Sequence, residues 1–187
     1  IKLLGHAQPQ TPATVQPCLV AKTGQLAQIG GALNAVEFTA EPVQTVLCTG
    51  PGAGAGPTAS AVLADVIDVA ASRGGLPFGM RVGQLARATR KKDEQARRYY
   101  LRLMVMDETG VLSAVTSILR DQQISVESML QKGQSDDKPV ALVLTTHPTA
   151  PDQIKAACSS LSSASFVSGA VMALSLIHIS EPTRRLI

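Results

Sequence analysis

Short hydrophobic runs, separated by turn-forming residues, fill the first 49 positions of the chain. The runs are IKLLGHA at 1–7, VQPCLVA at 15–21, NAVEFTA at 34–40 and QTVLCT at 44–49. Glycine, asparagine and proline separate them, and Pro42 falls between the last two runs, where a turn suits its fixed φ angle. This pattern predicts four short β-strands joined by turns.

The pattern becomes helical after Gly50. A glycine-rich stretch leads into a run whose apolar positions recur at i, i+3 and i+4. Pro57 fits the first turn of a helix, and Gly74 with Gly75 fits its C-terminal cap. The sequence therefore predicts a helix over 57–73 with one buried stripe, formed by Ala59, Val62, Leu63, Val66, Ile67 and Ala70.

Basic side chains gather in the segment that follows. Residues 81–102 hold eight basic and two acidic side chains. Such a run can contact nucleic acid or anionic lipid, but it contains no aromatic residue before Tyr99 and no motif that reads nucleic acid. We interpret 74–97 as a basic linker with a solvated helix.

Residues 98–174 return to alternating patterns in a β-α-β-β-α-β order. The first strand, YYLRLMVM, places Tyr99, Leu101, Leu103 and Val105 on one face. This order predicts a ferredoxin-like fold. The predicted elements are a strand at 99–106, a helix at 111–123, strands at 124–133 and 139–147, a helix at 152–161 and a strand at 165–174.

Composition narrows the classes of function. The chain is 45% hydrophobic and 17% charged with a net charge of +3, which excludes a disordered polymer. Two Tyr, three Phe and no Trp argue against a single-stranded nucleic-acid platform. The longest nearly uncharged apolar run, Phe166–Ile179, has 14 residues and is too short to span a membrane. Three scattered cysteines, Cys18, Cys48 and Cys158, predict neither a disulfide framework nor a metal site, and they favour a cytoplasmic protein.

Two strand-to-helix turns are the candidate sites. Gly50–Ala55 fits GxGxx(G/A), but no second strand ending in an acid follows, so a stand-alone dinucleotide fingerprint fails. A tight turn without ligand and a turn that lets backbone N–H groups approach an anion both remain open. The second turn, DETGVL at 107–112, fits either an ordinary turn capped by Thr109 or a carboxylate site. The rest of the sequence shows no complete catalytic constellation.

The segments IKLLG, QPCLVAKTGQLAQIGGALNAV and GPGAGAGPTASAVLADVID resemble, in order and spacing, the C-terminal part of homoserine dehydrogenases. The resemblance covers residues 1–73. Residues 98–174 look like the ACT regulatory domain that many members carry after a linker. The resemblance implies an α+β chain: a partial catalytic domain of β-strands with a return helix, followed by a ferredoxin-like βαββαβ ACT domain.

The family resemblance implies NAD(P)-dependent interconversion of L-aspartate 4-semialdehyde and L-homoserine, on the route to threonine, methionine and isoleucine. The family's catalytic lysine and Rossmann GxGxxG precede the IKLLG segment, so the resemblance places no catalytic residue in this chain and implies an inactive fragment. Gly54 corresponds to the nucleotide-contacting glycine, with Gly52 and Thr58 as neighbours. The resemblance implies NADP or NAD as the cofactor, and it implies that helix 57–73 would pack against a nucleotide domain.

The resemblance also implies feedback regulation by an amino acid, most simply threonine. The ligand carboxylate would meet the N–H groups of the turn, and Asp107 would take the ammonium. Gln131 would reach the ligand from a sheet-paired neighbour in a homodimer or higher homo-oligomer. The expected effector-binding residues are Asp107, Thr109, Gly110, Val111, Leu112 and Gln131.

Both ends of the chain carry further expectations. Ile1 opens inside a strand-like run without an initiator, which indicates a piece of a longer protein. The string SLIHISEPTRRLI at 175–187 departs from the family's ending and predicts a non-native tail. The alternative to the enzyme is a non-catalytic, amino-acid-sensing ACT protein, which a different upstream domain would reveal.

Overall fold

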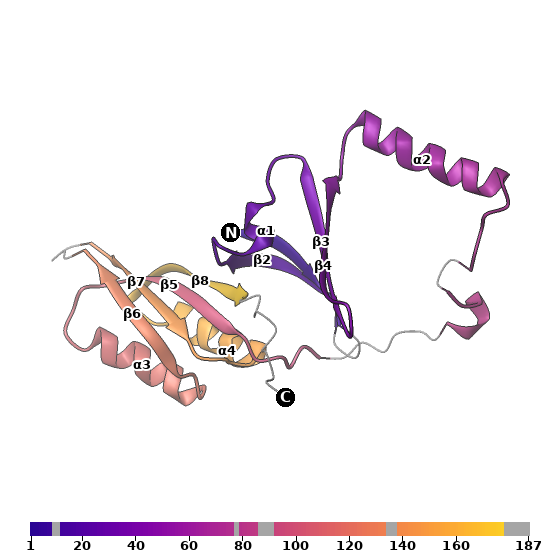
Figure 1. The fold of residues 1–187 in the computed structure, drawn as a ribbon. Helices are drawn as coiled ribbons and strands as arrows, with labels where there is room; N and C mark the ends of the chain where they lie inside the picture. The colour runs from indigo at the N-terminus through magenta and orange to yellow at the C-terminus, as the bar shows by residue number, and fades with distance from the viewer. Residues whose placement is uncertain (9–11, 77–78, 86–91, 134–137, 178–187) are drawn as a thin grey trace. The chain divides into compact units, whose positions relative to one another are not determined.

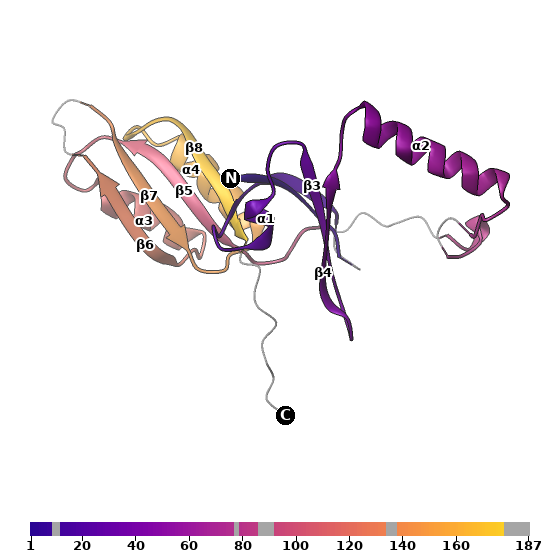
Figure 2. The same cartoon turned by 45° about the horizontal axis from the view of Figure 1, so that its top comes forward.

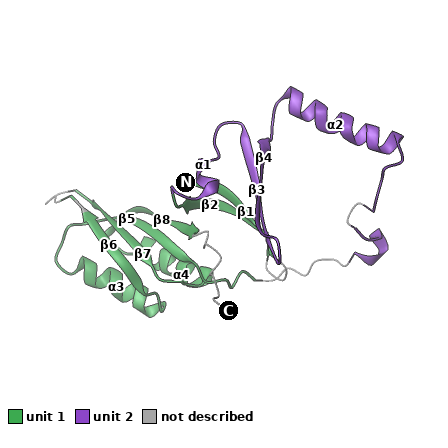
Figure 3. Cartoon of the chain, viewed as in Figure 1, with its two compact units in different colours: residues 1–21, 91–179 green, residues 22–90, 180–187 purple. Residues whose placement is uncertain are grey.

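The computed structural model describes residues 1–8, 12–76, 79–85, 92–133 and 138–177 (Figure 1). The chain divides into two compact units, coloured separately in Figure 3. Unit 1 combines residues 1–21 with 91–179, and unit 2 contains residues 22–90 and 180–187. Unit 1 thus joins the first two strands of the chain to the βαββαβ segment.

Unit 1 is built on a six-stranded sheet, which Figure 2 shows from a second direction. Its strands are β1 (Lys2–His6), β2 (Thr14–Val20), β5 (Arg98–Val105), β6 (Val126–Lys132), β7 (Val140–Thr146) and β8 (Val167–Ile177). They lie in the order β1-β2-β8-β5-β7-β6. The last four are antiparallel neighbours from the βαββαβ segment, which confirms the ferredoxin-like prediction.

The core of unit 1 lies between this sheet and two helices, α3 (Val111–Asp121) and α4 (Pro151–Ser162). Alternate residues of β5 face the helices, and Leu101 and Leu103 are almost fully buried. On α3, Leu119 is equally buried. The apolar faces that the strand and helix patterns predicted therefore pack against each other in one buried cluster.

Strands β1 and β2 extend the sheet beyond the βαββαβ segment. They form an antiparallel pair, and Cys18–Val20 of β2 runs parallel to Ser175–Ile177 of β8. Cys18 is 1% exposed and Ser175 is 3% exposed. The Ser175 hydroxyl donates to the Cys18 sulfur over 3.1 Å, and the Gln16 amide donates to the same hydroxyl over 3.3 Å.

Unit 2 contains a β-hairpin and a long helix. Its elements are α1 (Gln25–Gln28), β3 (Leu33–Ala40), β4 (Gln44–Pro51) and α2 (Ala55–Ala70). Strands β3 and β4 pair in register along their full length, with Pro42 in the turn between them, as predicted. Strand β4 then leads through a glycine turn into α2.

Helix α2 differs from its prediction at both ends. It begins at Ala55, two residues before Pro57, with Gly54 as its N-cap. It stops at Ala70, because Ser72 adopts a left-handed conformation with φ 53°. The N–H of Ser72 then bonds to the Val69 carbonyl. This is a Schellman ending, and it replaces the predicted Gly74–Gly75 cap.

The linker and the C-terminal segment also depart from expectation. Within the described part of 74–97, helical structure consists of one 3-10 turn at Val82–Gln84, and residues 77–78 and 86–91 lie outside the described ranges. Strand β8 continues to Ile177, so 175–177 belong to the sheet although the sequence predicted a tail from 175. Residues 178–187 lie outside the described structure.

Candidate functional site

The glycine turn before α2 has a backbone that requires glycine at one position. Gly54 has φ 120° and ψ 153°, a region that residues with a Cβ rarely enter. The Gly54 carbonyl accepts the first helical bond, from the N–H of Thr58 over 3.1 Å. Gly52 packs on Asn34, and a Cβ there would overlap the Asn34 amide. The turn itself thus accounts for Gly54, and close packing accounts for Gly52.

The start of α2 can still accept an anion. The N-cap makes no side-chain hydrogen bond and the first turn carries no acidic residue. The first N–H groups of a helix have no partner within it, and they carry partial positive charge. Gly54 and Thr58 line the same open groove along α2, so two of the three predicted cofactor residues lie together there.

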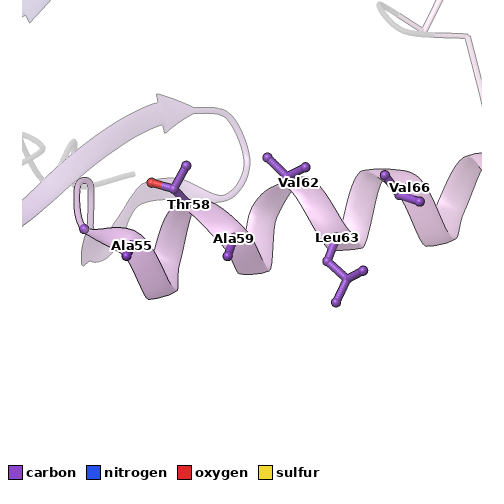
Figure 4. Close-up of a pocket in the computed structure, with 7 residues that line it drawn as sticks. Ala55, Thr58, Ala59, Val62, Leu63 and Val66 are labelled. Carbon is purple, nitrogen blue, oxygen red and sulfur yellow. The ribbon is translucent and has the colours of Figure 1, made fainter.

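The apolar stripe of α2 continues from this groove. Figure 4 shows Ala59, Val62, Leu63 and Val66 along the helix. The sequence predicted a buried stripe, but no residue of α2 is buried, and Val66 is 57% exposed. The predicted helical spacing is therefore confirmed. The prediction that the stripe is buried is wrong for the described residues.

The second turn opens α3 in unit 1. Its N-cap is Gly110, which has φ 93° and makes no side-chain capping bond. The alternative of a turn capped by Thr109 is therefore wrong, because the left-handed residue at the N-cap is Gly110. The N–H of Val111 bonds to the Glu108 carbonyl and that of Ala114 to the Gly110 carbonyl, over 3.3 and 2.9 Å.

Asp107 and Gln131 meet beside this turn. The Gln131 side-chain amide donates to Oδ1 of Asp107 over 2.8 Å, across 24 residues of sequence. The sequence analysis expected Gln131 of a neighbouring chain to reach the ligand. It did not predict this contact within one chain. The bond holds one carboxylate oxygen in place beside the start of α3.

The remaining predicted effector residues divide between the surface and the core. Thr109 and Gly110 are exposed, and Leu112 is 40% exposed. The Val111 side chain is buried and belongs to the apolar cluster, so it anchors the turn. The structure therefore brings the six predicted effector residues to the same part of unit 1, where the Val111 side chain is buried and its N–H already bonds to the Glu108 carbonyl.

Two ion pairs lie near the sheet of unit 1. Arg97 forms two hydrogen bonds to the Asp93 carboxylate, over 2.6 and 3.1 Å, and these hold the pKa of Asp93 below its usual range. Arg98 pairs with Glu127 and likewise lowers the pKa of that carboxyl. Among the described residues, no group of three or more His, Cys, Asp or Glu side chains is arranged to hold a metal ion. No described helix combines the length and apolar character needed to cross a membrane.

Comparison with known proteins covers both segments of the chain. The sequence model of homoserine dehydrogenase matches residues 1–67, and that of the ACT domain matches residues 99–161. The homoserine dehydrogenase of Neisseria gonorrhoeae is 36% identical over 86% of this chain and 39% of its own length. That of Helicobacter pylori is 34% identical over 80% of this chain and 36% of its own length. The chain thus spans less than two-fifths of these relatives.

Solved structures agree with the sequence comparison. A homoserine dehydrogenase from Thiobacillus denitrificans superposes with a TM-score of 0.74 at 33% identity, over 88% of this chain and 38% of that one. A homoserine dehydrogenase from S. aureus shares the fold, with a TM-score of 0.53 at 19% identity over 94% of this chain and 41% of that one. The order of the two matched segments, the βαββαβ sheet and these relatives together show that the chain belongs to the homoserine dehydrogenase family and carries an ACT domain.

Proposed function

We propose that this chain forms the C-terminal catalytic and regulatory part of an NAD(P)-dependent homoserine dehydrogenase. In the proposed reaction, NAD(P)H delivers hydride to the aldehyde carbon of L-aspartate 4-semialdehyde, and a proton completes the alcohol of L-homoserine. The observation that carries the proposal is the succession of a homoserine dehydrogenase match at 1–67 and an ACT match at 99–161. The rival, a non-catalytic sensor that borrowed the first segment, predicts a different upstream domain.

The glycine turn is the part of this chain that we assign to the cofactor, which supplies the hydride when bound. Gly54, the N-cap of α2, has no side chain, so the backbone at the entry to the helix stays open to close approach by a ligand. The uncapped N-terminus of the helix suits a phosphate, and Thr58 places a hydroxyl in the same groove. The exposed apolar stripe behind it would pack against the nucleotide-binding part of the enzyme.

The ACT unit would sense an amino acid, with threonine as the expected effector. The first N–H groups of α3 would donate hydrogen bonds to the ligand carboxylate, aided by the helix dipole. Asp107, held on one oxygen by Gln131, would accept the ligand ammonium. A second copy would complete the site, because the open edge of β6 can pair with another sheet. We place the enzyme in the cytoplasm.

A chimera tests the proposed function. The chain would replace the corresponding segment of the Neisseria gonorrhoeae enzyme, and NAD(P)-dependent homoserine oxidation would be assayed with and without threonine. We expect activity that threonine inhibits in the chimera, and no turnover from the chain alone. A folded chimera without activity would contradict the catalytic assignment. An active chimera that ignores threonine would contradict the regulatory one.

A further inference from the structure

A second opening lies on the helix side of the unit 1 sheet, next to α4. Its volume is about 580 Å³, which falls within the usual range for small-molecule sites. Tyr99 of β5 and Ala173 of β8 contribute from the sheet, and Gln16 contributes from β2. We call this opening the α4–β8 pocket.

The pocket exists because β2 and β8 pair over only part of their length. Their parallel register covers Cys18–Val20 and Ser175–Ile177. Before Cys18, β2 is paired with β1 alone, and no register joins it to β8 at Val171 or Ala173. The two strands therefore leave room between them under α4, where Val171 and Ala173 line the pocket.

Helix α4 presents a mixed surface to this space. Ile154, Cys158 and Ser162 recur at four-residue spacing and line the pocket, with Lys155 beside them. Among the described residues that line it, Lys155 is the only charged one. Burial raises the pKa of both the Cys158 thiol and the Tyr99 phenol, so each stays uncharged at neutral pH. The pocket thus combines one positive charge with an apolar floor.

We propose that the α4–β8 pocket binds a small aliphatic monocarboxylate. Its carboxylate lies at the Lys155 ammonium, and its aliphatic chain lies against the apolar side chains of the pocket, among them Cys158 and Val171. No acidic side chain lines the described pocket, so the site disfavours a ligand that also carries a strong cation. This site is independent of the proposed reaction and is separate from the Asp107–Leu112 turn.

Binding at this pocket would reinforce the joint between β2 and β8. Gln16 lies in the segment matched to homoserine dehydrogenase, whereas Tyr99 and α4 up to Leu161 lie in the segment matched to the ACT domain. The Gln16 amide already donates to Ser175 at the end of β8. A ligand seated between α4, Val171 of β8 and Gln16 of β2 therefore slows opening of the pairs between Cys18–Val20 and Ser175–Ile177.

Titration of the 187-residue chain followed by amide NMR tests the proposal. The probe is 3-methylbutanoate, with the neutral amide 3-methylbutanamide and equimolar chloride as controls. We expect saturable shifts at residues 154–162 and 171–173 with the carboxylate alone, and slower hydrogen exchange at Leu19 and Leu176. Lys155→Gln should weaken binding about two- to five-fold, as expected for an exposed ion pair. Lys22→Gln, in unit 2, should leave it unchanged.

A second variant that fills the pocket tests binding without changing the charge of Lys155. Ala173→Leu adds volume at the sheet side of the pocket and should abolish the shifts while the spectrum stays folded. Equal shifts with the carboxylate and the neutral amide would overturn the proposal. So would an unchanged affinity in Lys155→Gln, or shifts confined to residues 107–112.

Discussion

The Gln131 amide donates a hydrogen bond to the Asp107 carboxylate over 2.8 Å, and it thereby ties β6 to the turn that opens α3. The bond holds the Asp107 carboxylate beside the turn, where we propose that it accepts a hydrogen bond from a ligand ammonium. The partners are 24 residues apart, so the site depends on the sheet as well as on the turn.

Gln131→Ala should weaken threonine binding to the chain by roughly two- to ten-fold, the usual net contribution of one hydrogen bond. Ser128→Ala is the matched control, because it removes a hydrogen bond to Thr145 from the same strand. Calorimetric titration of both variants measures the effect. Equal affinities in Gln131→Ala and the unaltered chain would show that the contact does not position Asp107.

The glycine turn offers a pair of substitutions with opposite expected signs. Gly54→Ala forces a side chain onto φ 120° and should lower the free energy of unfolding by about 1–3 kcal/mol. Gly56→Ala lies in the first turn of α2 with nothing within 4 Å of the new Cβ. It should raise that free energy by about 0.5–1 kcal/mol.

Thermal melting followed at the helical circular-dichroism band compares the two variants. In the chimera, the same Gly56→Ala change probes the space above the turn. If Gly56→Ala raises the dissociation constant of the cofactor without loss of stability, the cofactor binds next to Gly56. A stabilised Gly54→Ala variant would contradict the backbone account of this turn.

The pair between Arg97 and Asp93 predicts an acid-dependent loss of stability. The hydrogen bonds from Arg97 lower the pKa of Asp93 in the folded state. The pair's contribution is therefore present above the unfolded carboxyl pKa, near pH 4, and is lost as pH falls through the lower folded value. Asp93→Asn should reduce the free energy of unfolding at pH 7. The difference in this free energy between the variant and the unaltered chain should shrink as pH falls below about 4.

Urea unfolding at several pH values measures this dependence. Asp121→Asn is the control, since Asp121 and Arg120 form an ion pair with exposed side chains, which contributes little. A difference between Asp93→Asn and the unaltered chain that stays constant from pH 7 to pH 2 would contradict the assignment.

Two truncations separate the sheet from the segment that follows it. Ending the chain after Ile177 should leave its melting temperature unchanged. Ending it after Leu174 removes Ser175 and the pairing of β8 with β2, and should lower the melting temperature by roughly 2–8 °C for a loss of about 1 kcal/mol. Scanning calorimetry of the two chains decides, and equal melting temperatures would show that residues 175–177 add nothing to the sheet.

Local sequence patterns predicted most elements of the fold because strands and helices bury their apolar residues at different periods. Leu101 and Leu103 alternate into the core as the strand pattern required. Helix ends were less predictable: Gly110 rather than Thr109 begins α3, and Ser72 rather than a glycine ends α2. At each end, the residue that takes the left-handed backbone decides the boundary.

Long-range pairing lies outside what a local pattern can show. Cys18 and Ser175 are 157 residues apart, yet they meet in the sheet of unit 1. For the stripe of α2, the local pattern was right but the burial was not. Its spacing identified an apolar face correctly, but periodicity does not identify the surface that covers it, and Val66 remains exposed among the described residues.

We propose that the ACT unit of this chain senses an amino acid at the Asp107–Leu112 turn. Calorimetric titration of the chain with threonine, methionine, isoleucine and lysine, repeated with Asp107→Ala, tests it most directly. We expect saturable heat with threonine that Asp107→Ala abolishes while the chain stays folded. No heat from any of the four amino acids, at concentrations where the chain is dimeric, would contradict it.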